Sequence, residues 1–350
     1  MSGLSLPLLI VVFGAAAAAI WVAGVHLSDA VDVLDERLHL GSALGGTILL
    51  AVATNLPEIA ITASAALQHA VGVAVGNILG GVAIQTVVLV ALDAFGVRPK
   101  RPLTYQAASL TLVLEAALVI GVLVVTVMGT QLPDHLYYLR MTPSAVLILI
   151  LWIVGMLLLS RAQHGLPWHD AGEPPDGQQP PKGHSQKTKE AQAGSTTRAA
   201  LTFAAAAVAT LVAGVVLERS GEQIAGHIGL SGVLFGATVL AAATALPELS
   251  TGLTSTKMGD YQLAMSDIFG GNAFLPVLFV LADLLSGRAV LPQAHDTDIY
   301  LTGLGALLTS VYAVGLIFRP ARNIARVGWD SLAVVLLYAV GIAGLVALAN

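Results

Sequence analysis

The sequence contains no cysteine and little charge, and these two shortages exclude several classes of protein. Without cysteine the chain can form neither a disulfide framework nor a thiolate metal site. Only 11% of its 350 residues are charged, against about a quarter in a typical soluble domain. The formal net charge of −5 is modest and argues against nucleic acid as a partner.

Apolar residues dominate the sequence instead. They make up 56% of the chain, and the mean hydropathy is +0.82. A chain of this composition is predicted to be a polytopic membrane protein, with the lipid bilayer as its surroundings. No segment of the sequence points to an obligatory protein partner.

Ten apolar windows have the length of about 20 residues that crosses a bilayer as a helix. They fall at residues 5–26, 43–67, 71–95, 104–129, 137–160, 199–217, 232–254, 261–286, 298–318 and 329–349. Because backbone polar groups cannot stay unpaired in lipid, and because these windows are too long for barrel strands, we expect helices. The first window is longer than a signal-peptide core and is expected to be a retained span. The predicted fold class is all-α, with ten transmembrane helices.

The basic residues predict how the helices are oriented. Ten spans place 13 of the 16 Lys and Arg residues on one side of the membrane, and that side is expected to be cytoplasmic. Both termini then lie outside an inner (plasma) membrane. Residues 162–197, rich in Pro, Gly, Gln and Lys, are expected to form a disordered cytoplasmic linker between two halves, 1–161 and 198–350.

The two halves contain an internal duplication. GTILLAVATNLPE at residues 46–58 reappears as GATVLAAATALPE at residues 236–248, and 16 of 48 positions match at this offset of 190 residues. Each half has five predicted spans. Because five is an odd number, the second half must enter the membrane inverted, and inverted repeats are typical of transporters.

Each copy of the repeat places a proline directly before a glutamate, near the middle of a predicted span. Proline lacks an amide proton, so the carbonyls one turn earlier, near Ala53 and Ala243, lose their helical partner. An unpaired carboxylate at this depth is also costly. One bound cation satisfies both needs, and a threonine one turn before each acid adds a hydroxyl. The repeated acids and hydroxyls are Glu58, Glu248, Thr54 and Thr244.

This set of oxygens predicts the kind of ion. Carboxylates, hydroxyls and backbone carbonyls suit hard cations such as Ca²⁺ or Na⁺, and about six to eight oxygens suit Ca²⁺ best. The predicted spans hold no mid-membrane Lys or Arg that would form an ion pair with the acids. We therefore expect a cation-binding or protonatable transport site, with no cofactor besides the transported ions.

The two copies of [AG]-T-x-L-P-E, each followed by a helix with G-N-x-x-G-[SG] or a degenerate form, resemble the α-repeats of the calcium/cation antiporter superfamily, which includes the sodium/calcium exchangers. The resemblance covers nearly the whole chain. It implies that the repeats pack antiparallel at mid-membrane and that the first span of each half slides to give alternating access. The ligands that it implies are Glu58, Glu248, Thr54, Thr244 and the backbone of Ala51 and Ala241.

The chain departs from that pattern at several ligand positions. Asn55 and Ala245 stand where exchangers of this kind usually carry Ser, and glycine replaces a second Ser in each repeat, at Gly81 and Gly271. The resemblance then implies that hydroxyl ligands are missing at these four positions.

The following helix of each repeat differs as well. Gln85 and Leu275 replace the polar ligands of the family, and only Gln85 still has a carbonyl oxygen to offer. Asp267 stands where the first repeat has Asn77. It either supplies a displaced carboxylate ligand or caps a helix.

Three further acids each have two interpretations. Glu115 lies mid-span without a counterpart in the second half, so it serves either a proton path or helix packing. Asp93 and Asp283 are repeated but lie near span ends, where we expect them at the membrane interface; lining an ion entrance is the alternative.

The sequence therefore predicts an antiporter that exchanges Ca²⁺, or a similar divalent cation, for H⁺ or Na⁺. Two glutamates are neutralised by one divalent or two monovalent cations, and the lost hydroxyls and Leu275 favour H⁺ slightly over Na⁺. A cation channel with a mid-membrane acidic site and a monovalent cation/H⁺ exchanger are the alternatives. An enzyme is not expected, because neither HExxH nor an aspartate-rich diphosphate motif occurs.

Overall fold

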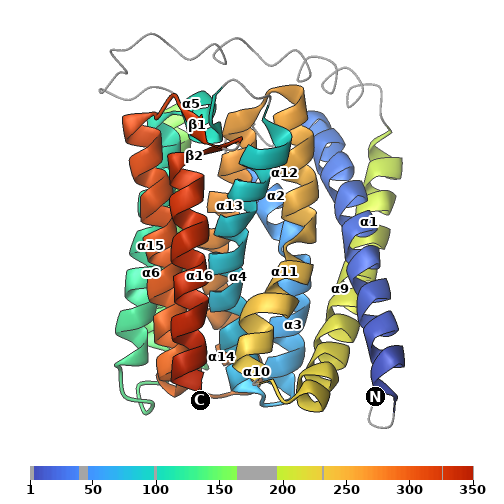
Figure 1. Cartoon of the computed structure of the whole chain (residues 1–350). Helices are drawn as coiled ribbons and strands as arrows, with labels where there is room; N and C mark the ends of the chain where they lie inside the picture. The colour runs from blue at the N-terminus through green and yellow to red at the C-terminus, as the bar shows by residue number, and fades with distance from the viewer. Residues whose placement is uncertain are drawn as a thin grey trace.

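The computed structural model describes residues 4–38, 46–97, 101–163, 195–230, 232–324 and 326–349. Apart from two short strands, β1 (Asn323–Ile324) and β2 (Val327–Gly328), the regular elements in these ranges are helices. They form one bundle with both chain ends at the same end (Figure 1). The predicted all-α membrane fold is confirmed, whereas most of the predicted linker, residues 164–194, lies outside the described ranges.

The helices of the first half are α1 (Leu6–Leu38), α2 (Gly46–Thr54), α3 (Leu56–Leu67), α4 (Val71–Ala91), the π-helix η2 (Leu92–Gly96), α5 (Leu103–Ala107), α6 (Leu110–Thr130) and α7 (Pro143–Gln163). Those of the second half are α9 (Thr196–Ile228), α10 (Gly232–Phe235), the π-helix η3 (Gly236–Leu240), α11 (Ala241–Thr244), α12 (Leu246–Met258), α13 (Tyr261–Phe274), the 3₁₀ turn η4 (Leu275–Val277), α14 (Leu278–Ser286), the 3₁₀ turn η5 (Leu291–Gln293), α15 (Asp296–Phe318) and α16 (Trp329–Ala349).

Eight helical segments in the described ranges are long and apolar enough to cross a membrane. They coincide with eight of the ten predicted spans. The other two, 43–67 and 232–254, are interrupted: the first contains α2 and α3, and the second contains α10, η3, α11 and α12. The count of ten transmembrane helices therefore stays a prediction.

The first and sixth spans are longer than predicted. α1 and α9 each have 33 residues, whereas the hydropathy windows ended at residues 26 and 217. A helix of that length extends about 50 Å, well beyond the roughly 30 Å of hydrocarbon. Hydropathy marks only the part of a helix that lies in lipid, so the polar ends of both helices were missed.

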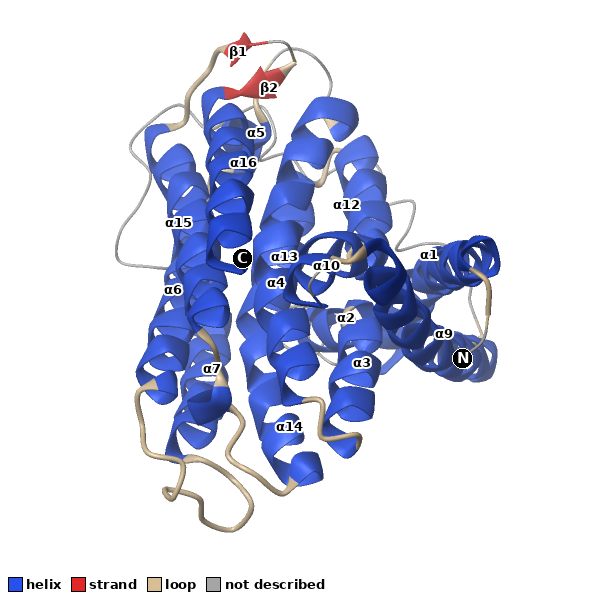
Figure 2. Cartoon of the chain, turned by 60° about the horizontal axis from the view of Figure 1, so that its bottom comes forward, coloured by secondary structure: helices blue, strands red, loops and turns tan. Residues whose placement is uncertain are grey.

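Two long helices pair along one edge of the bundle, and two other spans are enclosed at its centre. α1 and α9 pack along each other and also contact α12 and α3 respectively. Figures 1 and 2 show this pair at one side of the bundle, with α6, α7, α15 and α16 at the other. Between them, the spans that contain α4 and α13 have 67% of their apolar windows buried, against 22–50% in the other six. These two central spans are therefore the best shielded from lipid.

The two halves cross each other at the centre. α2 packs on α13 of the other half, and α11 packs on α4. Likewise α3 contacts α14, and α12 contacts η2. Each interrupted span thus lies against the central span of the opposite half, which brings both breaks into the interior.

Asp93 joins the end of the α4 segment to two distant parts of the chain. Its carboxylate accepts hydrogen bonds from the Leu103 amide at 2.8 Å, the Gly328 amide at 2.7 Å and the Ser331 hydroxyl at 2.7 Å. Only 1% of its surface is exposed. This acid therefore holds the start of α16.

Asp283 does the same at the end of α14. It accepts hydrogen bonds from the Thr142 amide at 2.8 Å, the Thr142 hydroxyl at 2.7 Å and the Val290 amide at 2.9 Å. This acid holds the start of α7 and has no exposed surface. That Asp93 and Asp283 lie at the membrane interface stays a prediction, and in the structure three donors satisfy each carboxylate in the protein interior.

Candidate ion-binding site

Both interrupted spans break at the residue before the repeated Leu-Pro-Glu. Asn55 separates α2 from α3 with φ −89° and ψ 15°, and Ala245 separates α11 from α12 with φ −78° and ψ 6°. Pro57 and Pro247 follow in the first turn of the new helix, where a missing amide proton costs nothing. The sequence thus stops one helix and starts another within a single residue.

The break places each repeated acid at the start of a helix. Glu58 and Glu248 lie in the first turns of α3 and α12, where the helix dipole stabilises negative charge. Neither side chain has exposed surface. The two acids interact electrostatically, so the predicted pairing of the repeats brings them together.

Gln85 from α4 connects the two repeats. Its side-chain amide donates to Glu248 Oε1 at 3.2 Å and to Asn55 Oδ1 at 3.1 Å. Thr244 and Gln85 also lie close to Glu58, although neither makes a hydrogen bond of standard geometry to its carboxylate. Gln85 therefore lies between both acids, where the sequence predicted a carbonyl ligand.

Several oxygens in this region accept no hydrogen bond from any residue that the structure describes. All are buried acceptors, and a cluster of acceptors without donors is the environment that a cation prefers. They are Oε1 and Oε2 of Glu58, Oε2 of Glu248, Oε1 of Gln85 and Oδ1 of Asn272.

The other predicted ligands are close to the acids in sequence and form hydrogen bonds within their own repeat. Asn55 Nδ2 donates to the Ala51 carbonyl at 2.7 Å, and the Thr54 hydroxyl donates to the Leu50 carbonyl at 3.1 Å. In the second repeat the Thr244 hydroxyl donates to the Ala241 carbonyl at 3.1 Å. Both hydroxyls keep lone pairs for a cation, while the Ala51 and Ala241 carbonyls each accept a backbone amide as well as a side-chain donor.

Asp267 is connected to Glu248 through Thr251. The Thr251 hydroxyl is 2.5 Å from Asp267 Oδ2 and 3.1 Å from the Glu248 backbone carbonyl, so it lies between the Asp267 side chain and the Glu248 backbone. Asp267 also repels Glu248 electrostatically. In the described residues no three His, Cys, Asp or Glu side chains come close enough to hold a metal alone. A cation here also depends on amide, hydroxyl or backbone oxygens.

The glycines that replace the family's serines have different neighbours in the two repeats. A Cβ at Gly271 would lie 3.0 Å from Asn55 Nδ2 and 3.3 Å from Gln85 Oε1. A Cβ at Gly81 would lie 3.0 Å from a methyl carbon of Leu275. One side of the site is therefore polar and crowded by amides, and the other side is apolar.

Two asparagines were not predicted as part of this region. Asn77 Nδ2 donates to the Glu58 carbonyl at 3.2 Å, and Asn272 Nδ2 donates to the Thr86 hydroxyl at 2.9 Å across the two halves. Both are almost fully buried. A lone asparagine in an apolar helix was the available signal. Glu115 instead accepts a hydrogen bond from Ser266 at 2.9 Å, which is a contact between α6 and α13.

A profile of the sodium/calcium exchanger protein family matches residues 8–161 and 198–347. The chain belongs to the sodium/calcium exchanger family. It is 23% identical over 305 residues to the inner membrane protein YrbG of Escherichia coli strain K12, covering 85% of this chain and 86% of that protein. It is 28% identical over 264 residues to the putative antiporter CaxA of Alkalimonas amylolytica, covering 75% and 74%.

Solved exchangers have the same fold. The H⁺/Ca²⁺ exchanger CAX superposes with a TM-score of 0.70 at 14% identity, over 96% of this chain and 82% of that chain. The sodium-calcium exchanger NCX_Mj gives a TM-score of 0.59 at 19% identity, over 97% and 99%. The family resemblance, and the prediction of an integral membrane transporter that is not an enzyme, are confirmed.

In this member of the family, the paired helices α1 and α9 contact the two breaks through glycine. A Cβ at Gly24 of α1 would lie 2.8 Å from Pro247 Cβ, and one at Gly214 of α9 would lie 3.1 Å from the Pro57 carbonyl. The two glycines are 190 residues apart, which is the offset of the repeat. Each long helix therefore packs at closest range on the break of the opposite half.

We expect Gly24→Ala and Gly214→Ala to destabilise the protein by about 1–3 kcal/mol, because an added methyl overpacks a rigid contact. Gly14→Ala and Gly226→Ala are matched controls on the same helices, since nothing lies within 4 Å of their added Cβ. The controls should be neutral or stabilising by up to about 1 kcal/mol through helix propensity. Thermal unfolding of the purified protein in detergent measures the difference, and a shift of one sign in all four variants would contradict it.

Proposed function

We propose that the chain is a secondary antiporter that exchanges Ca²⁺, or a similar divalent cation, for H⁺ or Na⁺ by alternating access. The observation that carries the proposal is the set of buried oxygens near Glu58 and Glu248 that accept no hydrogen bond from described residues. Carboxylates so far from water stay buried at moderate cost only when a cation or protons neutralise them.

The proposed ligands surround the junction of the two breaks. The carboxylates supply charge, and amide, hydroxyl and backbone oxygens complete the coordination. They are Glu58, Glu248, Asn55, Gln85, Thr54, Thr244, the carbonyls of Ala51 and Ala241, and Asp267. An arriving cation competes with the Gln85 amide for Glu248 Oε1, so Gln85 has to rotate its carbonyl oxygen toward the ion.

The enclosure of the acids favours alternating access over a channel. Glu58 and Glu248 have no exposed surface, so a cation between them would be cut off from both sides. α1 and α9 are suited to move, because they lie together at the edge of the bundle and meet both breaks at glycines. We infer that they are the sliding helices that the family resemblance implies.

We expect Glu58→Gln and Glu248→Gln each to reduce Ca²⁺ transport to background and to leave a folded protein. Each variant keeps the size of the side chain but removes a buried charge with no protein counter-charge, so folding should not suffer. The measurement is ⁴⁵Ca²⁺ uptake into proteoliposomes under a pH or Na⁺ gradient. Asp134→Asn, in an exposed loop, is the control and should transport normally.

Thermal unfolding of the same proteins provides a second measurement that does not require transport. Ca²⁺ at about a hundred times its Kd should stabilise the unsubstituted protein by about 2.7 kcal/mol and should not stabilise either variant. Full transport by a variant would remove that glutamate from the central site. Stabilisation by Na⁺ or K⁺ in place of Ca²⁺ would favour the monovalent cation/H⁺ exchanger.

The charge of the site predicts the stoichiometry. Two carboxylates balance one divalent cation, two protons or two Na⁺, while a third Na⁺ would leave excess positive charge in a low-dielectric site. Leu275 and the missing serine hydroxyls remove ligands for further Na⁺. We therefore propose electroneutral exchange, with H⁺ favoured over Na⁺ as the counter-ion. Asp267 or Glu115 would change the count if either joined the site as a charged group.

The rate of Ca²⁺ uptake under a fixed counter-ion gradient should then change less than about twofold with membrane voltage. A cycle that moves one net charge would instead shift its equilibrium by about 2.3 kcal/mol per 100 mV, or roughly 50-fold. Proteoliposomes clamped at several potentials with potassium and valinomycin make the comparison. Strong voltage dependence would rule out the two-carboxylate account.

We also propose that both termini face outward and that the linker at 162–197 is cytoplasmic. The absence of native cysteine makes a single introduced cysteine at Gly177 a clean probe. A membrane-impermeant maleimide should label it only after the cells are opened. Labelling of intact cells would reverse the orientation.

A further inference from the structure

A cavity of about 860 Å³ lies at the end of the bundle that carries the termini. The turn between α3 and α4, the last turns of α9, the π-helix η3 and the turn η5 contribute its walls. Neither Glu58 nor Glu248 lines it. The cavity is thus separate from the candidate ion-binding site.

Two acids from α9 line this cavity. Glu218 and Glu222 lie one helical turn apart, and their carboxylates repel each other. Glu218 is only 4% exposed, and the Ser64 hydroxyl that contacts its carboxylate is 3.5 Å away, at the outer limit of a hydrogen bond. No Lys or Arg among the described residues lines the cavity, and Arg219 is exposed outside it.

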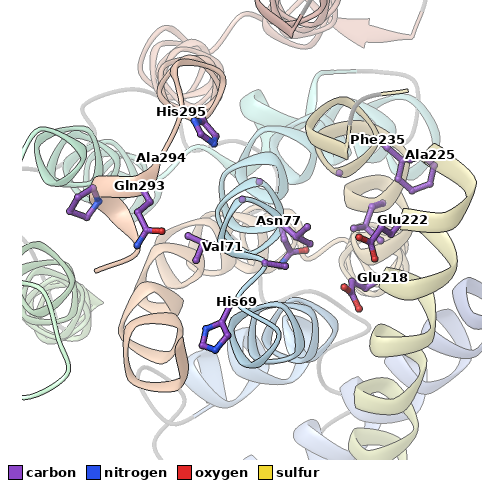
Figure 3. Close-up of a pocket in the computed structure, with 17 residues that line it drawn as sticks. His69, Val71, Asn77, Glu218, Glu222, Ala225, Phe235, Gln293, Ala294 and His295 are labelled. Atoms are coloured by element: carbon purple, nitrogen blue, oxygen red, sulfur yellow. The ribbon is translucent and has the colours of Figure 1, made fainter. Parts of the chain in front are cut away.

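Asn77 provides an independent sign of a ligand. It is 2% exposed and lines the cavity, with Glu218 and Glu222 on the opposite wall (Figure 3). Its Nδ2 is occupied by the Glu58 carbonyl and the Thr62 hydroxyl, at 3.2 and 3.3 Å. Its Oδ1 accepts no hydrogen bond from the described part of the chain. The cavity therefore has two carboxylates on one wall and a buried neutral oxygen on the other.

We propose that Glu218, Glu222 and Asn77 Oδ1 form an outer binding site for a hydrated divalent cation. Two negative charges and a neutral oxygen match a hard divalent ion, and the volume leaves room for its remaining water ligands. Because Glu222 is exposed and few protein oxygens take part, binding is weak and exchanges rapidly with solvent.

The position of Asn77 gives this outer site a role. The Asn77 side chain donates a hydrogen bond to the Glu58 backbone carbonyl, so Asn77 lies between the cavity and the central site. The outer site therefore raises the local concentration of the ion beside the central site. The ion enters the central site when Asn77 and the neighbouring helices move. This role rests on the proposed function, whereas binding in the cavity does not.

The duplication accounts for only one of the two acids. The positions of α1 that correspond to Glu218 and Glu222 at the offset of 190 residues are Ser28 and Asp32. Glu222 thus has an acidic counterpart, whereas Glu218, the buried acid of the pair, has none. Fold symmetry therefore does not explain Glu218, which agrees with a role at this end of the bundle.

The test counts Ca²⁺ sites by ⁴⁵Ca²⁺ equilibrium dialysis of detergent-purified, full-length protein. The unsubstituted protein should show one tighter and one weaker class of site. Glu58→Gln with Glu248→Gln should leave only the weaker class. Glu218→Gln with Glu222→Gln should leave only the tighter class, and all four substitutions should abolish binding.

Asp134→Asn with Asp296→Asn is the matched control, because it removes the same charge from exposed residues outside the cavity and should leave both classes intact. In proteoliposomes the Glu218→Gln/Glu222→Gln variant should need about 3- to 10-fold more Ca²⁺ for half-maximal rate, with an unchanged maximum. Weak binding that survives the cavity substitutions, or is lost in the control, overturns the outer site. If the cavity substitutions remove the weaker class as expected, but the tighter class survives Glu58→Gln/Glu248→Gln, the proposed function alone is overturned.

Discussion

Burying two carboxylates without a permanent partner is the constraint on which the rest of this structure depends. Glu58 and Glu248 have no exposed surface, and three of their four oxygens accept no hydrogen bond from the described residues. Such acids need the positive end of a helix, a shell of protein between them and lipid, and a mobile species that neutralises them. The prolines supply the helix ends, the central spans of α4 and α13 supply the shell, and we propose that the transported ions are the mobile species.

The buried acids that repeat in this chain are of two kinds. Asp93 and Asp283 each hold three donors and fasten the last helix of the opposite half. Glu58 and Glu248 repeat at the same offset and lack such donors. Repetition of an acid therefore does not identify an ion ligand, whereas the number of donors around it separates a structural acid from a candidate ligand.

How much could be predicted from the sequence follows from the range of each interaction. Hydropathy and proline act locally, so the all-α fold and both helix breaks could be predicted from the printed residues. The partners of Asp93 at Gly328 and Ser331 are 235 and 238 residues away, and no local pattern indicates them. The ends of α1 and α9 were missed because polar and charged residues interrupt the apolar windows there although the helices continue.

The serine-to-glycine changes show the same limit. From the sequence, Gly271 is a lost hydroxyl. In the structure, the space beside Gly271 faces the amides of Asn55 and Gln85, both from the other half. The change therefore accompanies a polar replacement across the interface, and no inspection of one repeat alone reveals it. Asn77 was overlooked as a cavity residue for a similar reason, since the cavity is formed by segments from both halves.

Divergence between the halves has a thermodynamic consequence for alternating access. If two inverted repeats were identical, the inward-facing and outward-facing states would be equivalent by symmetry and would have equal free energy. Here Gln85 is matched by Leu275, and Asn55 by Ala245, so an ion meets different ligands from the two halves. Glu218, which is matched by Ser28, adds a further difference at one end. A direction-dependent affinity has to arise from such differences, and in this chain they are concentrated at the candidate site and at the cavity beside it.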